Sequence, residues 1–254
     1  MRPVLLLDIE TIPDHWMARK VTGLDGFPDA IAQDPMAMAR LFPPKHEGEA
    51  FSFPKTLYHK VVEIAVCLID GSGGVVALRH LSRAVSSEAD LLRDFWAALD
   101  RNPGVRIATF NGRRFDVPVL VQRALRNGVS PAPIYRGNYR ARFQDGHIDL
   151  MEILSDYGAS PGLSQNEAAI MLGVPGKVGV DGGDVAALWE QGKAADIAAY
   201  CTCDVATLAL CYARLGIHTG WCLEEETVRI QEGVQSRLQK QTHPLYDEFL
   251  RALN

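Results

Sequence analysis

The feature that most constrains the fold is a short apolar run near the start of the chain, residues 4–7, which ends at Asp8. A continuous run of this kind predicts a strand buried on both faces, at the centre of a sheet covered by helices. Asp8 and Glu10 then flank Ile9 at the end of that strand. The two-residue period puts both carboxylates on one face, about 7 Å apart at their α-carbons. They can bind one ion together, or they can be two solvated acids at a strand end.

Hydrophobic patterns along the rest of the chain predict an α/β domain. Residues 61–69 and 75–81 are rich in β-branched side chains and are separated by a glycine-rich turn, which predicts a hairpin. Ser86 or Ser87 then caps a predicted helix at 88–99. The other predicted elements are a strand at 105–110, a helix at 114–127, a short strand at 147–150, and helices at about 164–172, 184–191, 194–214 and 223–239.

Residues 11–57 differ from the rest of the chain. They are rich in proline, with Pro13, Pro28, Pro35, Pro43, Pro44 and Pro54. Proline punctuates helices and strands, so we predict that this segment is an insertion or arm on the main domain.

Size and charge limit the class of protein. A chain of 254 residues, 47% of them hydrophobic and 22% charged, can bury a full core. No apolar run reaches the roughly 20 residues that cross a bilayer, so we expect a cytoplasmic protein without membrane association. The net charge of −5 is less basic than a nucleic-acid-binding protein usually carries, although the acids of a metal site contribute to it.

The five cysteines do not form a zinc or disulfide pattern, because no CxxC pair is present. Cys201 and Cys203 are the closest pair. On a helix, residues two apart point to nearly opposite sides, so we expect that these two thiols do not share a metal.

Two further segments place acidic side chains beside predicted elements. Asp116 follows the strand at 105–110 near a strand-to-helix junction, where loops of α/β sheets collect functional groups. The same residue would also suit the first turn of a helix. Tyr200 and Asp204 are four apart within a predicted helix, so their side chains share a face and can meet one site.

In this order, the three segments resemble the three exonuclease motifs of the DEDD superfamily: Asp8-Ile9-Glu10, Asn111-Gly112-Arg113-Arg114-Phe115-Asp116 and Tyr200-Cys201-Thr202-Cys203-Asp204. Tyr200, four residues before the last Asp, resembles the tyrosine branch. The chain is similar to predicted 3′–5′ exonucleases related to the proofreading domain of family B DNA polymerases. The resemblance implies a ribonuclease-H-like fold with a central mixed β-sheet flanked by helices over residues 1–215. Residues 216–254 would form a C-terminal helical extension packed on the same domain.

The resemblance also implies a mechanism. Asp8, Glu10, Asp116 and Asp204 would hold two divalent ions, Mg²⁺ or Mn²⁺, which suit carboxylate ligands. Tyr200, with an ordinary pKa of about 10, would orient the attacking water rather than act as a base. The substrate would be the 3′ end of a single-stranded nucleic acid, with DNA favoured, and the products would be nucleoside 5′-monophosphates.

Several residues are candidates for binding the strand. They are Asn111, Arg113, Arg114 and Lys177, together with Arg136, Arg140 and Arg142, which are interleaved with aromatic side chains. Guanidinium groups contact phosphates and aromatic rings stack on bases, although a solvated loop is the alternative for residues 136–142. We expect Asp149 to support a metal ligand or face the substrate, the alternatives being a strand-end cap or a surface pair with His147.

Two other functions are compatible with the motifs. The first is an exoribonuclease that trims RNA or degrades oligonucleotides, because no motif encodes a contact to the 2′-hydroxyl. The second is a non-catalytic nucleic-acid-binding relative, which the presence of all four acids and Tyr200 disfavours. Protein partners and oligomeric state have no signal in the sequence.

Overall fold

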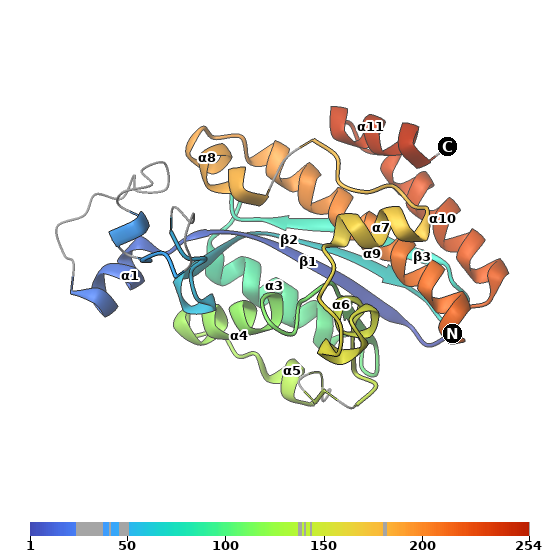
Figure 1. Ribbon diagram of the computed structural model, residues 1–254, viewed down its shortest axis with the longest axis horizontal. Helices are drawn as coiled ribbons and strands as arrows, with labels where there is room; N and C mark the ends of the chain where they lie inside the picture. The colour runs from blue at the N-terminus through green and yellow to red at the C-terminus, as the bar shows by residue number, and fades with distance from the viewer. Residues whose placement is uncertain are drawn as a thin grey trace.

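The computed structural model describes residues 1–23, 38–40, 42–45, 51–136, 139, 141–142, 144–179 and 182–253 (Figure 1). Its centre is a five-stranded sheet with the order β3-β2-β1-β4-β5. The strands are β1 (Val4–Pro13), β2 (His59–Ile69), β3 (Val75–Ser82), β4 (Arg106–Thr109) and β5 (His147–Asp149). β1 is antiparallel to β2 and parallel to β4, so the sheet is mixed, as predicted.

Helices connect and cover the strands. They are α1 (His15–Thr22), α3 (Glu88–Asp100), α4 (Asp116–Arg126), α5 (Ala132–Arg136), α6 (Leu150–Leu154), α7 (Gln165–Leu172), α8 (Val185–Glu190), α9 (Ala194–Thr219), α10 (Glu224–Leu238) and α11 (Pro244–Leu253), with 3₁₀ turns η1 (Thr56–Tyr58), η2 (Asp156–Gly158) and η3 (Gly182–Asp184). The hairpin and the helix capped by Ser87 are confirmed.

The two faces of the sheet carry separate hydrophobic cores. On one face, α3 and α4 pack against Leu5, Leu7 and Ile9 of β1. On the other, α9 and α10 pack against Val4 and Leu6. Because a strand alternates sides, the continuous apolar run of β1 supplies both cores. Figure 1 shows the two helical layers on opposite sides of the sheet.

Helix α9 is the longest of the described helices, at 26 residues. Within the described ranges it is also the one helix whose length and apolar composition would suffice to cross a membrane, but 78% of its most apolar window is buried. This burial is typical of a core helix, and α9 packs across β1, β2 and β3.

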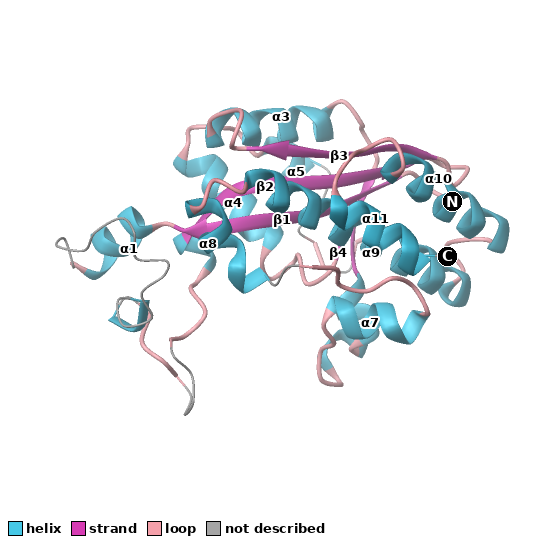
Figure 2. Cartoon of the chain, turned by 90° about the horizontal axis from the view of Figure 1, so that it is seen from above, coloured by secondary structure: helices cyan, strands magenta, loops and turns pink. Residues whose placement is uncertain are grey.

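The structure corrects the predicted end of the first strand. β1 continues past Asp8 and Glu10 as far as Pro13, so the two acids lie in the middle of the strand and residues 11–13 belong to the sheet rather than to the predicted arm. The pairing register with β2 shifts between Glu10 and Thr11, which marks a β-bulge beside the acids. Beyond β1 the chain forms α1, which Figure 2 shows extending past the end of the strand.

Two helix predictions also need correction. Helix α4 begins at Asp116 rather than at residue 114, because residues 111–115 form a turn after β4. The C-terminal segment holds a second helix, α11, which the sequence analysis missed. Both α10 and α11 contact α9, and α10 also contacts β3.

A buried ion-pair network joins α1, α3 and α4. The guanidinium of Arg123 donates to both oxygens of Glu88, at 2.8 and 2.6 Å, and to Asp14 at 2.6 Å. Burial by itself raises the pKa of Asp14. A hydrogen bond from the Met17 N–H group, the nearby Lys60 ammonium and Arg123 outweigh that effect, so the pKa of Asp14 lies below its ordinary value.

Candidate functional site

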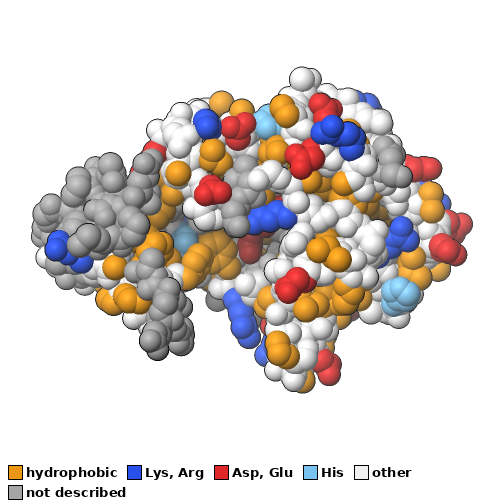
Figure 3. Space-filling model, turned by 45° about the horizontal axis from the view of Figure 1, so that its top comes forward, with side chains coloured by type: hydrophobic (Ala, Val, Ile, Leu, Met, Phe, Trp, Pro, Cys, Tyr) orange, Lys and Arg blue, Asp and Glu red, His pale blue; other side chains and the backbone are white. Residues whose placement is uncertain are grey.

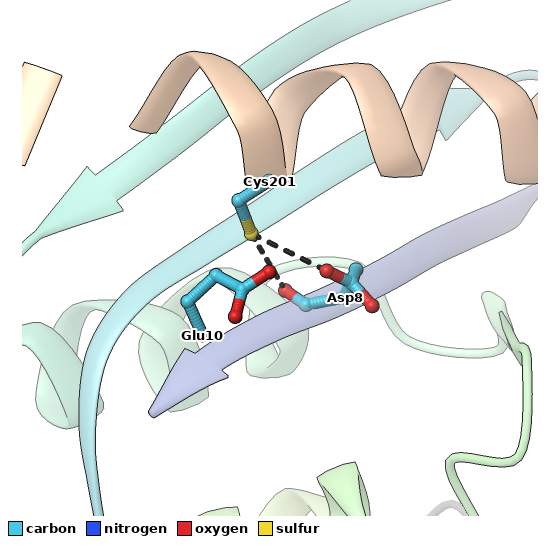
Figure 4. Close-up of side chains that lie close together, drawn as sticks. All are labelled: Asp8, Glu10 and Cys201. Carbon is cyan, nitrogen blue, oxygen red and sulfur yellow. Dashed lines mark hydrogen bonds between the residues drawn. The ribbon is translucent and has the colours of Figure 1, made fainter. Parts of the chain in front are cut away.

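Asp8 and Glu10 lie on the same face of β1, as the two-residue period predicted, and this face is covered by α9. Figure 4 shows both carboxylates beside Cys201, which α9 places over the strand. The ligand atoms of these three residues all lie within 4.8 Å of one another. The Cys201 thiol donates to the Asp8 carboxylate at 3.5 Å and to the Asp8 carbonyl at 3.7 Å.

Asp116 is carried to this cluster by a tight turn after β4. Asn111 has a positive φ of 61°, and the carbonyl of Asn111 accepts hydrogen bonds from the N–H groups of Arg114 and Phe115. A Cβ at Gly112 would come within 2.5 Å of the Thr109 side chain, so this position requires glycine. The turn therefore leaves Asp116 as the first residue of α4, buried beside β1.

Asp149 holds this turn in place from β5. Its carboxylate accepts hydrogen bonds from the N–H groups of Asn111 at 2.9 Å and Arg113 at 3.0 Å. The same carboxylate caps α6 through the N–H groups of Met151 and Glu152. One buried side chain thus fixes both the turn before Asp116 and the start of α6.

Tyr200 and Asp204 lie one helical turn apart on α9, as predicted, and line a small cavity of about 140 Å³ together with Lys177. The Lys177 ammonium lies 5.8 Å from the centre of the Tyr200 ring. Gln165 donates to the backbone carbonyl of Asp204 at 2.8 Å, which ties α7 to this part of α9. Figure 3 shows acidic side chains inside a hollow of this face, with Lys or Arg side chains beside it.

Burial raises the pKa of all four carboxylates. Burial is the largest cause for Asp8 and Glu10, and the charges of Asp116 and Asp204 act in the same direction on both. Burial also raises the pKa of Asp116 to about 7 and that of Asp204 to about 6, although Tyr200 and Lys177 lower the second value.

Two neutral side chains complete the cluster. Burial raises the pKa of Tyr200 above its ordinary value, and the negative charge of Asp204 and its hydrogen bond with the phenol raise it further. Burial and the charge of Asp8 likewise raise the pKa of the Cys201 thiol. At neutral pH both groups are therefore protonated hydrogen-bond donors.

The composition of the cluster fits divalent cations. The acids outnumber the basic groups in the cluster: the charge of Lys177 lowers the pKa values of Glu10 and Asp204, and burial still leaves both raised. A cation bound among close carboxylates stabilises their ionised forms, so that all of them can be charged at the same time. Oxygen ligands of this kind suit Mg²⁺ or Mn²⁺.

Unlike Lys177, several of the predicted strand-binding arginines lie away from the carboxylates. The Arg113 side chain turns to Glu152 at 3.0 Å, and Arg142 pairs with the same carboxylate at 3.2 Å. Arg136 pairs with Asp100 on an exposed surface. The Arg114 side chain is exposed and forms no ion pair within the described part of the chain. Arg140 lies outside the described residues.

Two residues near the cluster were missed by the sequence analysis. Cys201 lies 193 positions from Asp8 and could not be assigned to it by local spacing. Glu63 is buried directly opposite Glu10 in the β1–β2 register, raises its pKa, and accepts a hydrogen bond from His80 at 2.7 Å. A single charged residue inside the apolar run 61–69 was the signal for Glu63.

Comparisons with known proteins agree with this architecture. A family model described as a predicted 3′–5′ exonuclease related to the exonuclease domain of PolB matches residues 51–253. The family B DNA polymerase from the hyperthermophilic archaeon Pyrobaculum calidifontis is similar in structure, at 18% identity and a TM-score of 0.57. The similarity covers 94% of this chain and 29% of the polymerase chain, so the chain spans less than a third of that protein.

A weaker structural likeness is to E. coli exonuclease I in complex with a dA16 oligonucleotide. It has 14% identity and a TM-score of 0.40, and covers 94% of this chain and 45% of that one. No curated protein matches the chain in sequence. The polymerase likeness and the mixed sheet flanked by helices confirm the ribonuclease-H-like fold.

Proposed function

Because the chain belongs to the family of predicted 3′–5′ exonucleases related to the exonuclease domain of PolB, we propose that it hydrolyses single-stranded nucleic acid, with DNA favoured, from the 3′ end. One observation carries the proposal: β1, α4 and α9 bring four carboxylates together, close enough that the charges of Asp116 and Asp204 raise the pKa values of Asp8 and Glu10. Such a set supports phosphodiester hydrolysis because it can concentrate positive charge where negative charge develops.

Asp8, Glu10, Asp116 and Asp204 would hold the metal ions, Mg²⁺ or Mn²⁺. Two such ions supply a water of lowered pKa and stabilise the negative charge of the phosphate. The charges of the other three acids all raise the pKa of Asp8, so Asp8 would be a ligand whose ionised form depends on the bound cations.

Tyr200 would position the attacking water. Its hydroxyl remains protonated at neutral pH and hydrogen-bonds with Asp204, so it can orient a water but cannot act as a base. Attack on the terminal phosphodiester would release nucleoside 5′-monophosphates.

Three other residues would support strand binding. Lys177 lines the cavity beside Tyr200 and Asp204, where its ammonium can meet a phosphate. Arg114 is exposed two residues before Asp116, so its guanidinium can contact a phosphate of the strand. Asp149 acts indirectly, since it fixes the backbone of Asn111 and Arg113 in the turn that positions Asp116.

A direct assay tests this function. Purified protein is incubated with 5′-labelled single-stranded DNA or RNA in Mg²⁺, Mn²⁺ or chelator, alongside Asp8→Asn. The matched control is Asp94→Asn, which removes an exposed carboxylate on α3. We expect a metal-dependent ladder that shortens from the 3′ end, is abolished in Asp8→Asn, and is unchanged in Asp94→Asn.

The other results are equally informative. Faster shortening of RNA than of DNA would replace the preferred substrate by RNA. Strand binding without cleavage in either metal would instead favour the non-catalytic relative and reject the enzyme.

A further inference from the structure

A second cavity, of about 340 Å³, lies at the β5 edge of the sheet. Arg106, Arg113 and Arg142 line it, with aromatic walls from Tyr157 and Trp221, and none of the four site carboxylates takes part. In the sheet, Arg106 pairs with Val4, four residues before Asp8, which is roughly 13 Å along the strand. The cavity is therefore separate from the carboxylate cluster.

Arg106 is the unusual residue in this cavity. Its side chain is buried, with 9% exposure for the residue, yet it makes one hydrogen bond within the described chain, from Nη2 to the Tyr212 hydroxyl at 3.1 Å. Its Nε is buried without a partner, and no carboxylate of the described residues pairs with it. A guanidinium has five N–H donors and is always charged, so a buried one without a counter-ion is costly.

The acids around the cavity are already engaged. Glu152 is shared by Arg113 and Arg142, at 3.0 and 3.2 Å. The Asp149 carboxylate accepts backbone N–H groups, and the exposed Asp145 faces Arg2 at 3.4 Å. Arg106 is therefore left without a counter-ion among the described residues. An anion bound in the cavity would balance its charge.

The walls of the cavity suit a flat group. Trp221 stacks on Tyr212 with the ring centres 5.5 Å apart, and its indole N–H group is occupied by the Tyr212 carbonyl. The Arg142 guanidinium lies 5.9 Å from the centre of the exposed Tyr157 ring. Aromatic and guanidinium planes stack on bases, and a volume of this size accommodates one nucleotide-sized ligand.

We propose that this cavity is a second nucleotide site, which binds one nucleoside 5′-monophosphate. Its phosphate pairs with Arg106 and its base stacks on the Trp221 or Tyr157 side. The choice of a nucleotide among aromatic phosphates rests on the proposed function, because that reaction would release such a molecule.

The site is connected to the carboxylate cluster by two residues. Asp149 and Arg113 line the cavity, and their hydrogen bond fixes the turn that leads to Asp116.

Calorimetric titration tests the binding step without hydrolysis. The Asp8→Asn protein is titrated in chelator with thymidine 5′-monophosphate, thymidine, inorganic phosphate, and a 5′-phosphorylated hexathymidylate. Loss of Asp8 and of metal prevents binding of the products at the carboxylates. We expect one site for thymidine 5′-monophosphate, with at least tenfold weaker binding of thymidine and of phosphate.

Variants of the pocket are compared in the same background. Arg106→Met should weaken binding of thymidine 5′-monophosphate at least tenfold, and Arg93→Met, which changes an exposed arginine on α3, should leave it unchanged. Arg106→Met should fold with an unchanged thermal midpoint, because removal of an unpaired buried charge is neutral or stabilising. Trp221→Leu supplies an independent test of the stacking wall and should also weaken binding.

Three results would overturn the proposal. They are no binding of thymidine 5′-monophosphate, equal binding in Arg106→Met and Arg93→Met, or equal affinity for inorganic phosphate. Tighter binding of the hexathymidylate through Arg106 would also reject a free nucleotide and assign the cavity to the substrate strand. None of these results depends on whether the chain cleaves nucleic acid, so the two proposals can fail separately.

Discussion

Two groups of carboxylates lie inside this protein, and they differ in the charge of their neighbours. One group surrounds a guanidinium, and the other consists of acids that repel one another. In the ion-pair network, Asp14 and Glu88 share the guanidinium of Arg123, and the pKa of Asp14 is lowered. In the site, Asp116 and Asp204 lie near further carboxylates, and burial raises their pKa values to about 7 and about 6.

The difference teaches which carboxylates serve the fold and which serve a ligand. A buried acid that stabilises the fold is balanced by a cation of the protein itself. Acids that repel one another reduce stability until an external cation joins them. Changes in the two groups should therefore have opposite effects on stability.

The largest expected effect is the loss of catalysis in Asp204→Asn. Removal of one metal ligand should reduce the rate of 3′-end hydrolysis by roughly a thousandfold. The same change removes one repelling charge, so the metal-free variant should be at least as stable as the wild type. Turnover and thermal unfolding measured on one preparation test both expectations. A variant that is both inactive and less stable without metal would contradict the comparison.

A change in the ion-pair network should have the opposite result: stability should fall and the rate of hydrolysis should be retained. Arg123→Met leaves Asp14 and Glu88 without their shared cation, which should cost about 3–5 kcal/mol of unfolding free energy. Denaturant unfolding at neutral pH measures this loss. At a temperature where the variant is folded, its rate of hydrolysis per folded molecule should remain close to that of the wild type. A neutral effect on stability would show that the network is dispensable.

Metal binding should stabilise the site and leave the network unaffected. At a metal concentration of 100 times the dissociation constant, the expected gain is about 2.7 kcal/mol. Thermal unfolding with Mg²⁺ or Mn²⁺, compared with chelator, measures the gain. It should disappear in Asp8→Asn and persist in Arg123→Met, if that variant is folded at the start of the scan. Equal stabilisation of both variants would place the ions elsewhere.

The smallest expected effect is on the pH dependence of the metal-free protein. The folded-state pKa of Asp116, about 7, exceeds its unfolded value, so its contribution to stability is present at low pH and is lost as the pH rises through 7. Raising the pH from 6 to 8 should therefore lower stability, by about 1 kcal/mol.

His80 acts in the same direction, because its hydrogen bond to Glu63 raises its folded pKa. Thermal unfolding of the wild type and Asp116→Asn at both pH values isolates the contribution of Asp116 from those of His80 and of the other carboxylates with raised pKa values. The loss of stability between pH 6 and pH 8 should be smaller in Asp116→Asn. An equal loss in both proteins would show that Asp116 does not contribute to it.

Local spacing predicted the features that depend on neighbouring residues. Asp8 and Glu10 share a face because strands alternate, and Tyr200 and Asp204 share a face because helices repeat every 3.6 residues. Helix α11 was also predictable, since Pro244 is its first residue and Tyr246 and Phe249, three apart, are both buried. It was missed although the signal was present.

Other features depend on packing between distant segments. The pairing of Cys201 with Asp8 follows from the packing of α9 over β1, which no short pattern encodes. Arg113 was expected beside the substrate because of its position in the chain. Its side chain turns to Glu152 instead, and the choice among counter-ions is made only when β5 and α6 reach their places. The continuation of β1 to Pro13 was missed because the apolar run stops at Asp8 and the strand continues through the polar residues Glu10 and Thr11.

The β-bulge between Glu10 and Thr11 has a consequence for how such a chain can diversify. A bulge accommodates one extra residue in the strand. The in-and-out alternation of side chains before the bulge therefore does not fix the alternation after it. Lengthening or shortening the chain beyond Pro13 leaves the facing of Asp8 and Glu10 unaltered. Asp14, the residue after the strand, is held by Arg123, so the segment that follows is anchored to α4 while the side-chain alternation around Asp8 and Glu10 is set on the other side of the bulge.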